Sequence, residues 1–242
     1  MELNGKVAIV TGGAVRLGKA LALALAEHGA RLAIHYASSA GPAQETVAEI
    51  EALGSDGLAV QADLSRPGEA MSIVERAVAH FGRVDILVNS AAIFQPGNWD
   101  DTTEANWDRH FAINLKSPFF LSQAFAVHVG LERPGHIVNI ADWRGVRPGT
   151  DHVPYTLTKA ALIAMTKSLA LALAPNVQVN AIAPGMILPP PGEDRSYLER
   201  KAGQIPARRV GSPEEIAKTM LFLLRSDFVT GDLIFVTGGE HL

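Results

Sequence analysis

Cysteine is absent from this chain of 242 residues, so disulfide bonds and thiolate metal sites are excluded. The eight histidines show no HExxH or other ligand spacing, and no carboxylates cluster as they would in a metal site. We therefore expect no catalytic metal.

The chain also lacks an excess of positive charge. Its formal net charge is −4, which argues against nucleic acid or an anionic membrane surface as a partner. The N-terminus has no basic start and too short an apolar run for a secretory signal. The most apolar stretch, AALIAMTKSLALALA, contains Lys167 and is shorter than a membrane span. We expect a cytoplasmic protein that acts on a small molecule.

Short apolar runs alternate with helical patterns along the whole chain, and this alternation predicts the fold. Most of the runs are continuously apolar, as in strands that are covered on both faces. Short right-handed crossovers then give an α/β fold, a single-domain Rossmann-like, doubly wound parallel sheet of about seven strands with helices on both faces. We expect strands at 6–10, 31–36, 57–62, 83–89, 135–141, 177–183 and 232–236, and helices near 16–29, 41–54, 67–82, 104–130, 154–174 and 213–225.

No repeat, linker or charge block divides the chain, so residues 1–242 are expected to form one dinucleotide-binding and catalytic domain. The segment 186–205 is rich in proline, glycine and charge and interrupts the alternation, which favours an irregular substrate lid. Two helix starts are recognisable, with Ser65 and Ser212 as the expected N-caps.

A glycine-rich turn, Thr11 to Gly18, follows the first strand and precedes an alanine- and leucine-rich helix. In this setting backbone N–H groups and the helix dipole can hold a pyrophosphate. Gly12 permits a tight turn and Gly18 permits close packing of the helix. A plain strand-to-helix turn is the alternative interpretation.

Tyr155 and Lys159 lie four residues apart at the start of a predicted helix, so both side chains share one face. A lysine ammonium beside a phenol lowers the pKa of the phenol, which enables proton exchange near neutral pH. Asp142 lies thirteen residues upstream at the end of an apolar run, where a strand delivers its carboxyl to the same place. Helix capping is the alternative role for Asp142.

With the glycine turn and the YxxxK pair placed, the chain resembles the short-chain dehydrogenase/reductase family over essentially its whole length. The family loop reads TGxxxGxG. Further matching pieces are Asp63 in ADLS, Asn89 in NSAA, Asn114 in INLKS, and Pro184-Gly185 after the sixth strand.

Two departures from the family pattern indicate a branch. Arg16 replaces the middle glycine of the loop, and Asp142 replaces the usual serine. Together with Phe94 and the His35-Tyr36 pair, these residues resemble the pteridine reductase branch, in which a phenylalanine lies over the bound pterin. Arg16 could pair with a cofactor phosphate and reach the substrate. Phe94 could stack on a flat heterocycle, or it could be ordinary core packing.

A carboxyl at position 142 suits a nitrogen heterocycle better than a ketone. It can accept N–H hydrogen bonds or relay a proton to a ring nitrogen, whereas it would repel a developing alkoxide. An anionic Asp142 would raise the pKa of Tyr155 and oppose Lys159, so we expect a coupled group of three residues.

The resemblance implies the remaining roles. Tyr155 would donate the proton, Lys159 would also bind the nicotinamide ribose, and Asn114 would hold a water that links the lysine to solvent, unless it is a locally bonded buried asparagine. Asp63 would bind the adenine, or serve only a β-turn. The expected substrate residues are Arg16, Phe94, Asp142 and Tyr155. The expected cofactor residues are Gly12, Arg16, Leu17, Gly18, His35, Tyr36, Ser38, Ser39, Asp63, Leu64, Asn89, Ser90, Ala91, Tyr155, Lys159, Pro184, Gly185 and Met186.

NADPH is favoured over NADH because no acidic residue follows the second strand to repel a 2′-phosphate. Hydroxyls at Ser38 and Ser39, the His35 imidazole and Arg16 could receive that phosphate. The leading hypothesis is an NADPH-dependent reductase of pterins, acting on a carbon–nitrogen double bond. The alternatives are a carbonyl reductase for a ketone or 3-oxoacyl substrate and a non-catalytic NADP(H)-sensing protein. The apolar helix 154–174 and the resemblance favour a homotetramer.

Overall fold

Seven parallel strands form one sheet, in the order β3-β2-β1-β4-β5-β6-β7, in the computed structural model, which describes residues 1–130, 133–190 and 192–242. The strands are β1 (Val7–Val10), β2 (Arg31–Tyr36), β3 (Gly57–Gln61), β4 (Ile86–Asn89), β5 (Gly135–Ile140), β6 (Val177–Pro184) and β7 (Leu233–Val236). Every predicted strand is present within three residues of its expected bounds. The predicted doubly wound α/β fold is confirmed.

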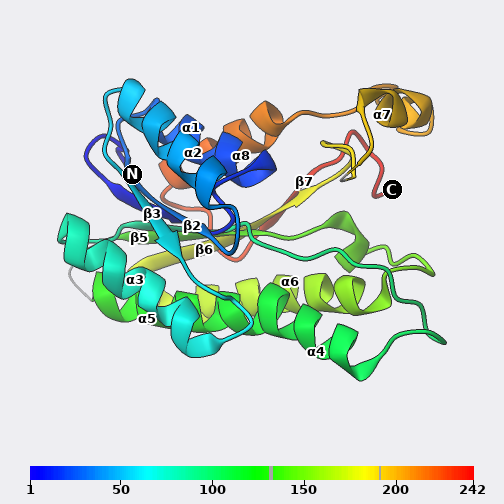
Figure 1. Cartoon of the computed structure of the whole chain (residues 1–242), viewed down its shortest axis with the longest axis horizontal. Coiled ribbons are helices and arrows are strands. Elements are labelled where there is room, and N and C mark those ends of the chain that lie inside the picture. The colour runs from blue at the N-terminus through cyan, green and yellow to red at the C-terminus, as the bar shows by residue number, and fades with distance from the viewer. Residues whose placement is uncertain (131–132, 191) are drawn as a thin grey trace.

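Helices cover both faces of the sheet (Figure 1). On one face lie α1 (Arg16–Ala26), α2 (Ala40–Ala52) and α8 (Pro213–Arg225); on the other lie α3 (Pro67–Phe81), α5 (Ser117–Val129) and α6 (Val153–Leu173). This double cover explains why the central strands are apolar throughout, because both rows of their side chains are buried.

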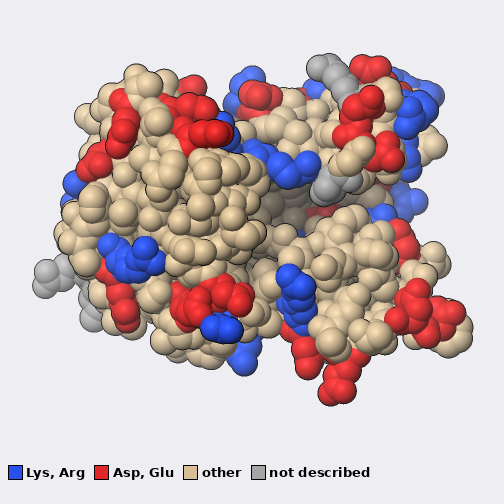
Figure 2. Space-filling model, viewed as in Figure 1, with Lys and Arg blue, Asp and Glu red and all other residues tan. Residues whose placement is uncertain are grey.

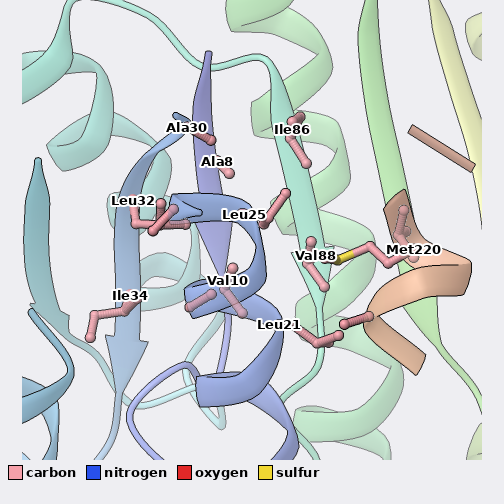
Figure 3. Packing of buried hydrophobic residues seen from close by; sticks show 14 of the residues in the cluster. Ala8, Val10, Leu21, Leu25, Ala30, Leu32, Ile34, Ile86, Val88 and Met220 are labelled. Atoms are coloured by element: carbon pink, nitrogen blue, oxygen red, sulfur yellow. The ribbon is translucent and has the colours of Figure 1, made fainter. Parts of the chain in front are cut away.

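The packing of α1 and α8 on the sheet fixes where the first helix begins. Leu21 and Leu25 of α1 and Met220 of α8 are fully buried against Val10 and Val88 (Figure 3). Each such side chain stabilises the fold by about 1.5–3 kcal/mol on burial. Since α1 is held down along its length, its N-terminus stays at the carboxyl end of β1.

The strand order reverses between β1 and β4. Strand β1 pairs with β2 on one side and with β4 on the other, so the connections after these two strands diverge to opposite faces. In open α/β sheets this divergence creates a crevice at the carboxyl ends of the strands, where ligands bind. The fold therefore predicts the site between the loops that follow β1 and β4.

The predicted helix 104–130 is continuous but not uniform. It consists of α4 (Glu104–Phe111), a π-helical turn η1 (Ala112–Lys116) and α5. The π turn contains Asn114, which is buried, and such turns occur often at functional sites. Hydrophobic periodicity does not distinguish a π turn from the flanking α-helix, which is why it was missed.

The expectation that 186–205 is irregular throughout is wrong, because Arg195–Ala202 forms helix α7. The Asp194 side chain caps this helix by accepting from the Ser196 N–H at 2.9 Å. Pro191 of the predicted lid lies outside the described residues. In Figure 1, α7 lies beyond the carboxyl end of the sheet.

The two predicted N-caps have opposite outcomes. Ser212 and Glu215 form a capping box at the start of α8, as expected. Ser65 does not cap α3; the N-cap is Arg66, and the Ser65 hydroxyl donates to Asp63 at 2.7 Å.

Helix α6 is longer than the apolar stretch suggested. At 21 residues, with an 18-residue window of mean hydropathy 1.3, the whole helix meets the length and composition of a membrane span, which the apolar stretch AALIAMTKSLALALA by itself does not. The helix nevertheless packs on β6 and buries Thr158, Lys159 and Thr166. It is a core helix whose exposed side carries apolar residues such as Leu171, which is 84% exposed.

Candidate active site

The glycine turn between β1 and α1 has no room for side chains at two positions. Gly12 has a φ of 66°, and a Cβ there would lie 3.1 Å from the Ala91 Cα. A Cβ on Gly18 would lie 2.1 Å from the carbonyl oxygen of Gly12, well inside contact distance. The loop therefore packs closely on the start of α1.

Arg16 occupies the position where the family has a glycine, and its φ of 54° lies in the left-handed region. That conformation costs a non-glycine residue about 1–2 kcal/mol. The side chain is exposed, and Nη2 donates to the Pro189 carbonyl at 2.6 Å. Arg16 thus joins the glycine turn to the lid segment across the crevice.

Two buried side chains fix the turn from behind. The Thr11 hydroxyl accepts from the N–H groups of Ser90 and Ala91, both at 3.0 Å, and so joins the ends of β1 and β4. His35 Nδ1 accepts from the Gly12 N–H at 3.1 Å, which leaves Nε2 to donate to the Ala62 carbonyl at 3.0 Å. Burial lowers the pKa of His35 below its ordinary value, so the ring is neutral.

His35 cannot receive a phosphate as predicted, because its ring is neutral, 2% exposed and bonded through both nitrogens. It shapes the glycine turn instead. The sequence predicts an imidazole near the end of β2, but it does not reveal that the ring points into the protein toward Gly12 and Ala62.

A cavity of about 380 Å³ follows the crevice. Figure 2 shows a hollow near the middle of this face, with Lys and Arg side chains at its rim and largely uncharged walls. Of the predicted cofactor residues, those that line the cavity are Gly12, Arg16, Leu17, Gly18, His35, Asp63, Leu64, Ser90 and Ala91. Arg109 of α4 also lines it and was missed, because nothing in the sequence pairs that helix with the glycine turn.

The other predicted cofactor residues do not line this cavity. Tyr36 is the last residue of β2, and Ser38 and Ser39 follow it. The Asn89 side chain points away from it, since it is buried and donates to Asn139 Oδ1 at 2.8 Å. The Asn89 side chain therefore holds β4 to β5, and a role of this position beside the cofactor stays a prediction for its backbone.

Asp63 has the turn role considered for it, and its side chain also reaches the cavity. Its Oδ1 accepts from the N–H and hydroxyl of Ser65, at 2.9 Å and 2.7 Å, which is a turn contact. These hydrogen bonds hold the pKa of Asp63 below its ordinary value. The residue also lines the cavity, with half of its side chain exposed.

The carboxyl end of β6 is held by the C-terminal segment. The Gly185 N–H donates to the Val236 carbonyl at 2.9 Å, and the Met186 N–H donates to Glu240 Oε2 at 3.0 Å. A Cβ on Gly185 would lie 2.7 Å from that carboxylate, so glycine is needed there. Burial raises the pKa of Glu240 above its ordinary value. The Pro184-Gly185-Met186 turn therefore has a fixed path beside the reaction centre.

Asp142 and Tyr155 are in direct contact. The Tyr155 hydroxyl donates to Asp142 Oδ2 at 2.7 Å, while Oδ1 accepts from the Arg144 N–H at 2.8 Å. The second bond caps the short 3₁₀ helix η2 (Trp143–Gly145). Asp142 is thus a helix cap and also the partner of Tyr155, because the capping bond to Oδ1 directs Oδ2 toward the phenol.

The electrostatics differ from the expectation in one respect. Burial first, and then the negative charge and hydrogen bond of Asp142, raise the pKa of Tyr155 well above its ordinary value. Lys159 does not lower it: Nζ donates to the Ile140 carbonyl at 2.6 Å and lies 5.6 Å from the centre of the Tyr155 ring. Burial lowers the pKa of Lys159 to about 8. The predicted lowering of the tyrosine pKa by Lys159 is therefore wrong in this structure.

Asn114 is bonded locally. Its Oδ1 accepts from the Ile93 N–H at 2.9 Å, and its Nδ2 donates to the Ile93 carbonyl and the Thr158 hydroxyl. With both ends of the amide engaged, the side chain positions the loop after β4, which carries Phe94.

Phe94 lies at the mouth of the site rather than in the core, with 48% of its surface exposed. Its ring meets the Tyr155 ring edge-on, with centroids 4.6 Å apart. The His152 ring is stacked on it at 3.9 Å, nearly parallel. Core packing is therefore excluded as the role of Phe94.

His152, Arg144 and Asp151 were missed as site residues. All three follow β5 in a loop without regular periodicity, and their proximity depends on how that loop folds back. Among the described residues no group of three or more His, Asp or Glu side chains is arranged to hold a metal ion.

Comparison with known proteins places this geometry in context. A family model described as enoyl-(acyl carrier protein) reductase matches residues 13–241. The (2S)-((R)-hydroxy(phenyl)methyl)succinyl-CoA dehydrogenase subunit BbsD of Thauera aromatica is 36% identical over 252 residues, which cover 100% of this chain and 99% of that protein. The 3-oxoacyl-(acyl-carrier-protein) reductase FabG of Staphylococcus aureus is 35% identical over 242 residues, 98% of each chain.

Among solved structures, FolM alternative dihydrofolate reductase 1 from Brucella canis, complexed with NADP, superposes with a TM-score of 0.92. It is 36% identical and covers 100% of this chain and 96% of its own. The similarity thus extends from the glycine turn to the C-terminal segment.

A methyl group at position 18 tests the glycine turn. Gly18→Ala would push the Gly12 carbonyl away, and we expect at least a tenfold weaker affinity for NADPH, measured by fluorescence titration. Gly68→Ala is the matched control, because a Cβ there meets nothing within 4 Å. Equal affinities of the two variants would show that the turn does not hold the cofactor.

Removal of the buried lysine tests the electrostatics. The pKa of Lys159 is lower in the folded protein than in the unfolded chain, so the folded protein binds this proton less well. The resulting loss of folding stability is largest below about pH 8 and disappears as the pH rises toward the pKa of the unfolded chain. We expect Lys159→Met to stabilise the protein at pH 7 by about 1–3 kcal/mol while abolishing activity. Thermal unfolding at pH 7 and pH 10 measures this, with exposed Lys167→Met as the control. A lower melting temperature of Lys159→Met at pH 7 would contradict it.

Proposed function

The chain belongs to the short-chain dehydrogenase/reductase family, and we propose that within it the protein is an NADPH-dependent reductase of pterins. The observation that carries the proposal is the 2.7 Å hydrogen bond from the Tyr155 hydroxyl to the Asp142 carboxylate, beside the exposed ring of Phe94. A carboxylate and an aromatic face together match a flat heterocycle that carries N–H groups.

NADP(H) fits the crevice. The glycine turn excludes side chains where a pyrophosphate needs close approach, and the N-terminus of α1 faces the cavity. Arg16 and Arg109 line the cavity and supply positive charge, and no acidic residue follows β2 until Glu45. The FolM neighbour from Brucella canis carries NADP, which supports the same choice here.

The chemistry divides between cofactor and protein. When bound, NADPH supplies a hydride to the carbon of a C=N bond. Tyr155 is protonated at neutral pH, since burial and Asp142 raise its pKa above an ordinary value of 10.0, and its hydroxyl would donate the proton to the ring nitrogen. The carboxylate of Asp142 accepts an N–H of the substrate and orients the ring. The charged Lys159, fixed by the Ile140 carbonyl, would bind the nicotinamide ribose.

The second candidate is a carbonyl reductase for a ketone or 3-oxoacyl substrate. The similarity to FabG of Staphylococcus aureus favours it. The charge of Asp142 disfavours it, since an alkoxide forming beside Tyr155 would be repelled by a carboxylate that shares the same hydroxyl. The intact Tyr155–Lys159 pair disfavours a non-catalytic sensor.

The proposal includes a cytoplasmic homotetramer. Large apolar side chains are exposed on α5, α6 and α8, among them Val127 at 74%, Leu171 at 84% and Phe222 at 55%. Such residues on helices at both faces of the sheet favour burial against further copies of the chain.

Turnover of a dihydropterin tests the proposal directly. With 7,8-dihydropterin and NADPH, we expect loss of the nicotinamide absorbance, and Tyr155→Phe should lose at least a hundredfold in rate because the proton donor is gone. Good turnover of ketones with none of any pterin would reject the assignment.

The residue at position 142 separates the two candidates. We expect Asp142→Ser to lower kcat/KM for the dihydropterin at least tenfold and to raise it for a 3-oxoacyl thioester, since a hydroxyl no longer repels an alkoxide. Unchanged pterin reduction in Asp142→Ser would favour the carbonyl reductase.

A further inference from the structure

We propose that Asp151 is a positioning residue which, through His152 and Arg144, fixes the plane of Phe94 so that its ring can stack on a flat substrate. The inference rests on the proposed function, because it concerns how a heterocycle is held in the same site. It adds three residues of the loop after β5 to the substrate machinery.

The contacts form a closed ring around the reaction centre. Arg144 Nη1 donates to Asp151 Oδ1 at 2.7 Å, and His152 Nδ1 lies 2.9 Å from Asp151 Oδ2. The imidazole of His152 is stacked on Phe94 at 3.9 Å with an interplanar angle of 1°. Phe94 meets the edge of Tyr155 at 4.6 Å.

The ring closes through Asp142. Tyr155 donates to this carboxylate, and the backbone N–H of Arg144 donates to its other oxygen. The guanidinium of Arg144 also lies 5.9 Å from the centre of the Phe94 ring. Of the two carboxylates in this ring, only Asp151 contacts both the Arg144 guanidinium and the His152 imidazole. Asp151 therefore fixes how Asp142 and Tyr155 are placed relative to Phe94.

The backbone is built to allow this arrangement. A Cβ on Gly149 would lie 2.9 Å from Asp151 Oδ1 and 3.2 Å from Arg144 Nη1, so a side chain there would disturb the ion pair. His152 has a φ of 53°, which is unfavourable for a non-glycine residue and persists only where its surroundings hold it. The next residue, Val153, donates its N–H to the Gly97 carbonyl at 2.7 Å, which ties this turn to the loop that carries Phe94.

The ion pair between Arg144 and Asp151 contributes little to the stability of the fold. Nearly half of the Asp151 side chain is exposed, and exposed pairs contribute little to folding. The pair instead fixes two side chains at the site. The imidazole of His152 is held against Phe94, and the guanidinium of Arg144 is held near Phe94 and close to Asp142. Half of the Phe94 surface remains open although His152 covers part of it, so the ring still has room for a partner.

Kinetics of Asp151→Asn and His152→Ala test the inference. Since a misaligned aromatic wall weakens binding and leaves Tyr155 and Lys159 in place, we expect KM for 7,8-dihydropterin to rise about two- to tenfold, with kcat within about twofold of the wild-type value. His152→Phe keeps a ring but loses the bond to Asp151, so its KM should stay raised, and a wild-type KM in this variant would show that the bond is not needed. Asp56→Asn is the matched control, because Asp56 also pairs with a histidine, His80 at 3.9 Å, but lies just before β3, at the end of the sheet opposite the crevice.

A substrate-free readout accompanies the kinetics. In the wild-type protein the His152 ring protons should show an upfield NMR shift from Phe94, and Asp151→Asn should lose most of it. An unchanged shift or an unchanged KM in Asp151→Asn overturns the inference while leaving the proposed function intact. If the wild-type protein reduces no pterin, the proposed function fails, and the substrate role given to Asp151 fails with it.

Discussion

The hydrogen bond between the Tyr155 hydroxyl and the Asp142 carboxylate is the interaction on which the site depends. It places a carboxylate beside the phenol and, together with the larger effect of burial, raises the pKa of the phenol well above its ordinary value. Both groups are delivered by the fold: Asp142 follows β5, and Tyr155 lies in the first turn of α6. Because a buried phenol cannot shed its proton to water, the proton is available only to what lies beside it.

Burial sets the remaining electrostatics. Lys159 is almost wholly buried, which lowers the pKa of its ammonium group. The ammonium donates to the Ile140 carbonyl rather than to the phenol. Arg144 supplies the positive charge that opposes Asp142 at Tyr155. Burial weakens that charge, but the hydrogen bond and charge of Asp151 more than offset this and raise the pKa of Arg144. The site thus has two cations with different roles, one in the core and one on the loop.

Much of this could be predicted from the sequence because periodicity and motif spacing report backbone layout. The seven strands and the glycine turn follow from apolar runs and motif spacing, and the Asp142–Tyr155 proximity follows from the position of Asp142 at the end of an apolar run. Side-chain direction could not be predicted: His35 and Asn89 stand at the expected positions but turn into the protein. The π turn around Asn114 and helix α7 lack a distinct apolar period. The contacts of Asp151 with Arg144 and His152 depend on an irregular loop, whose path is fixed by tertiary contacts.

The account is tested most directly by a crystal structure of the ternary complex with NADP⁺ and 7,8-dihydropterin. It predicts a ring nitrogen of the pterin within about 3 Å of an Asp142 carboxylate oxygen, with the ring parallel to Phe94. A pterin bound elsewhere, or an Asp142 carboxylate turned away from the ligand, would contradict it.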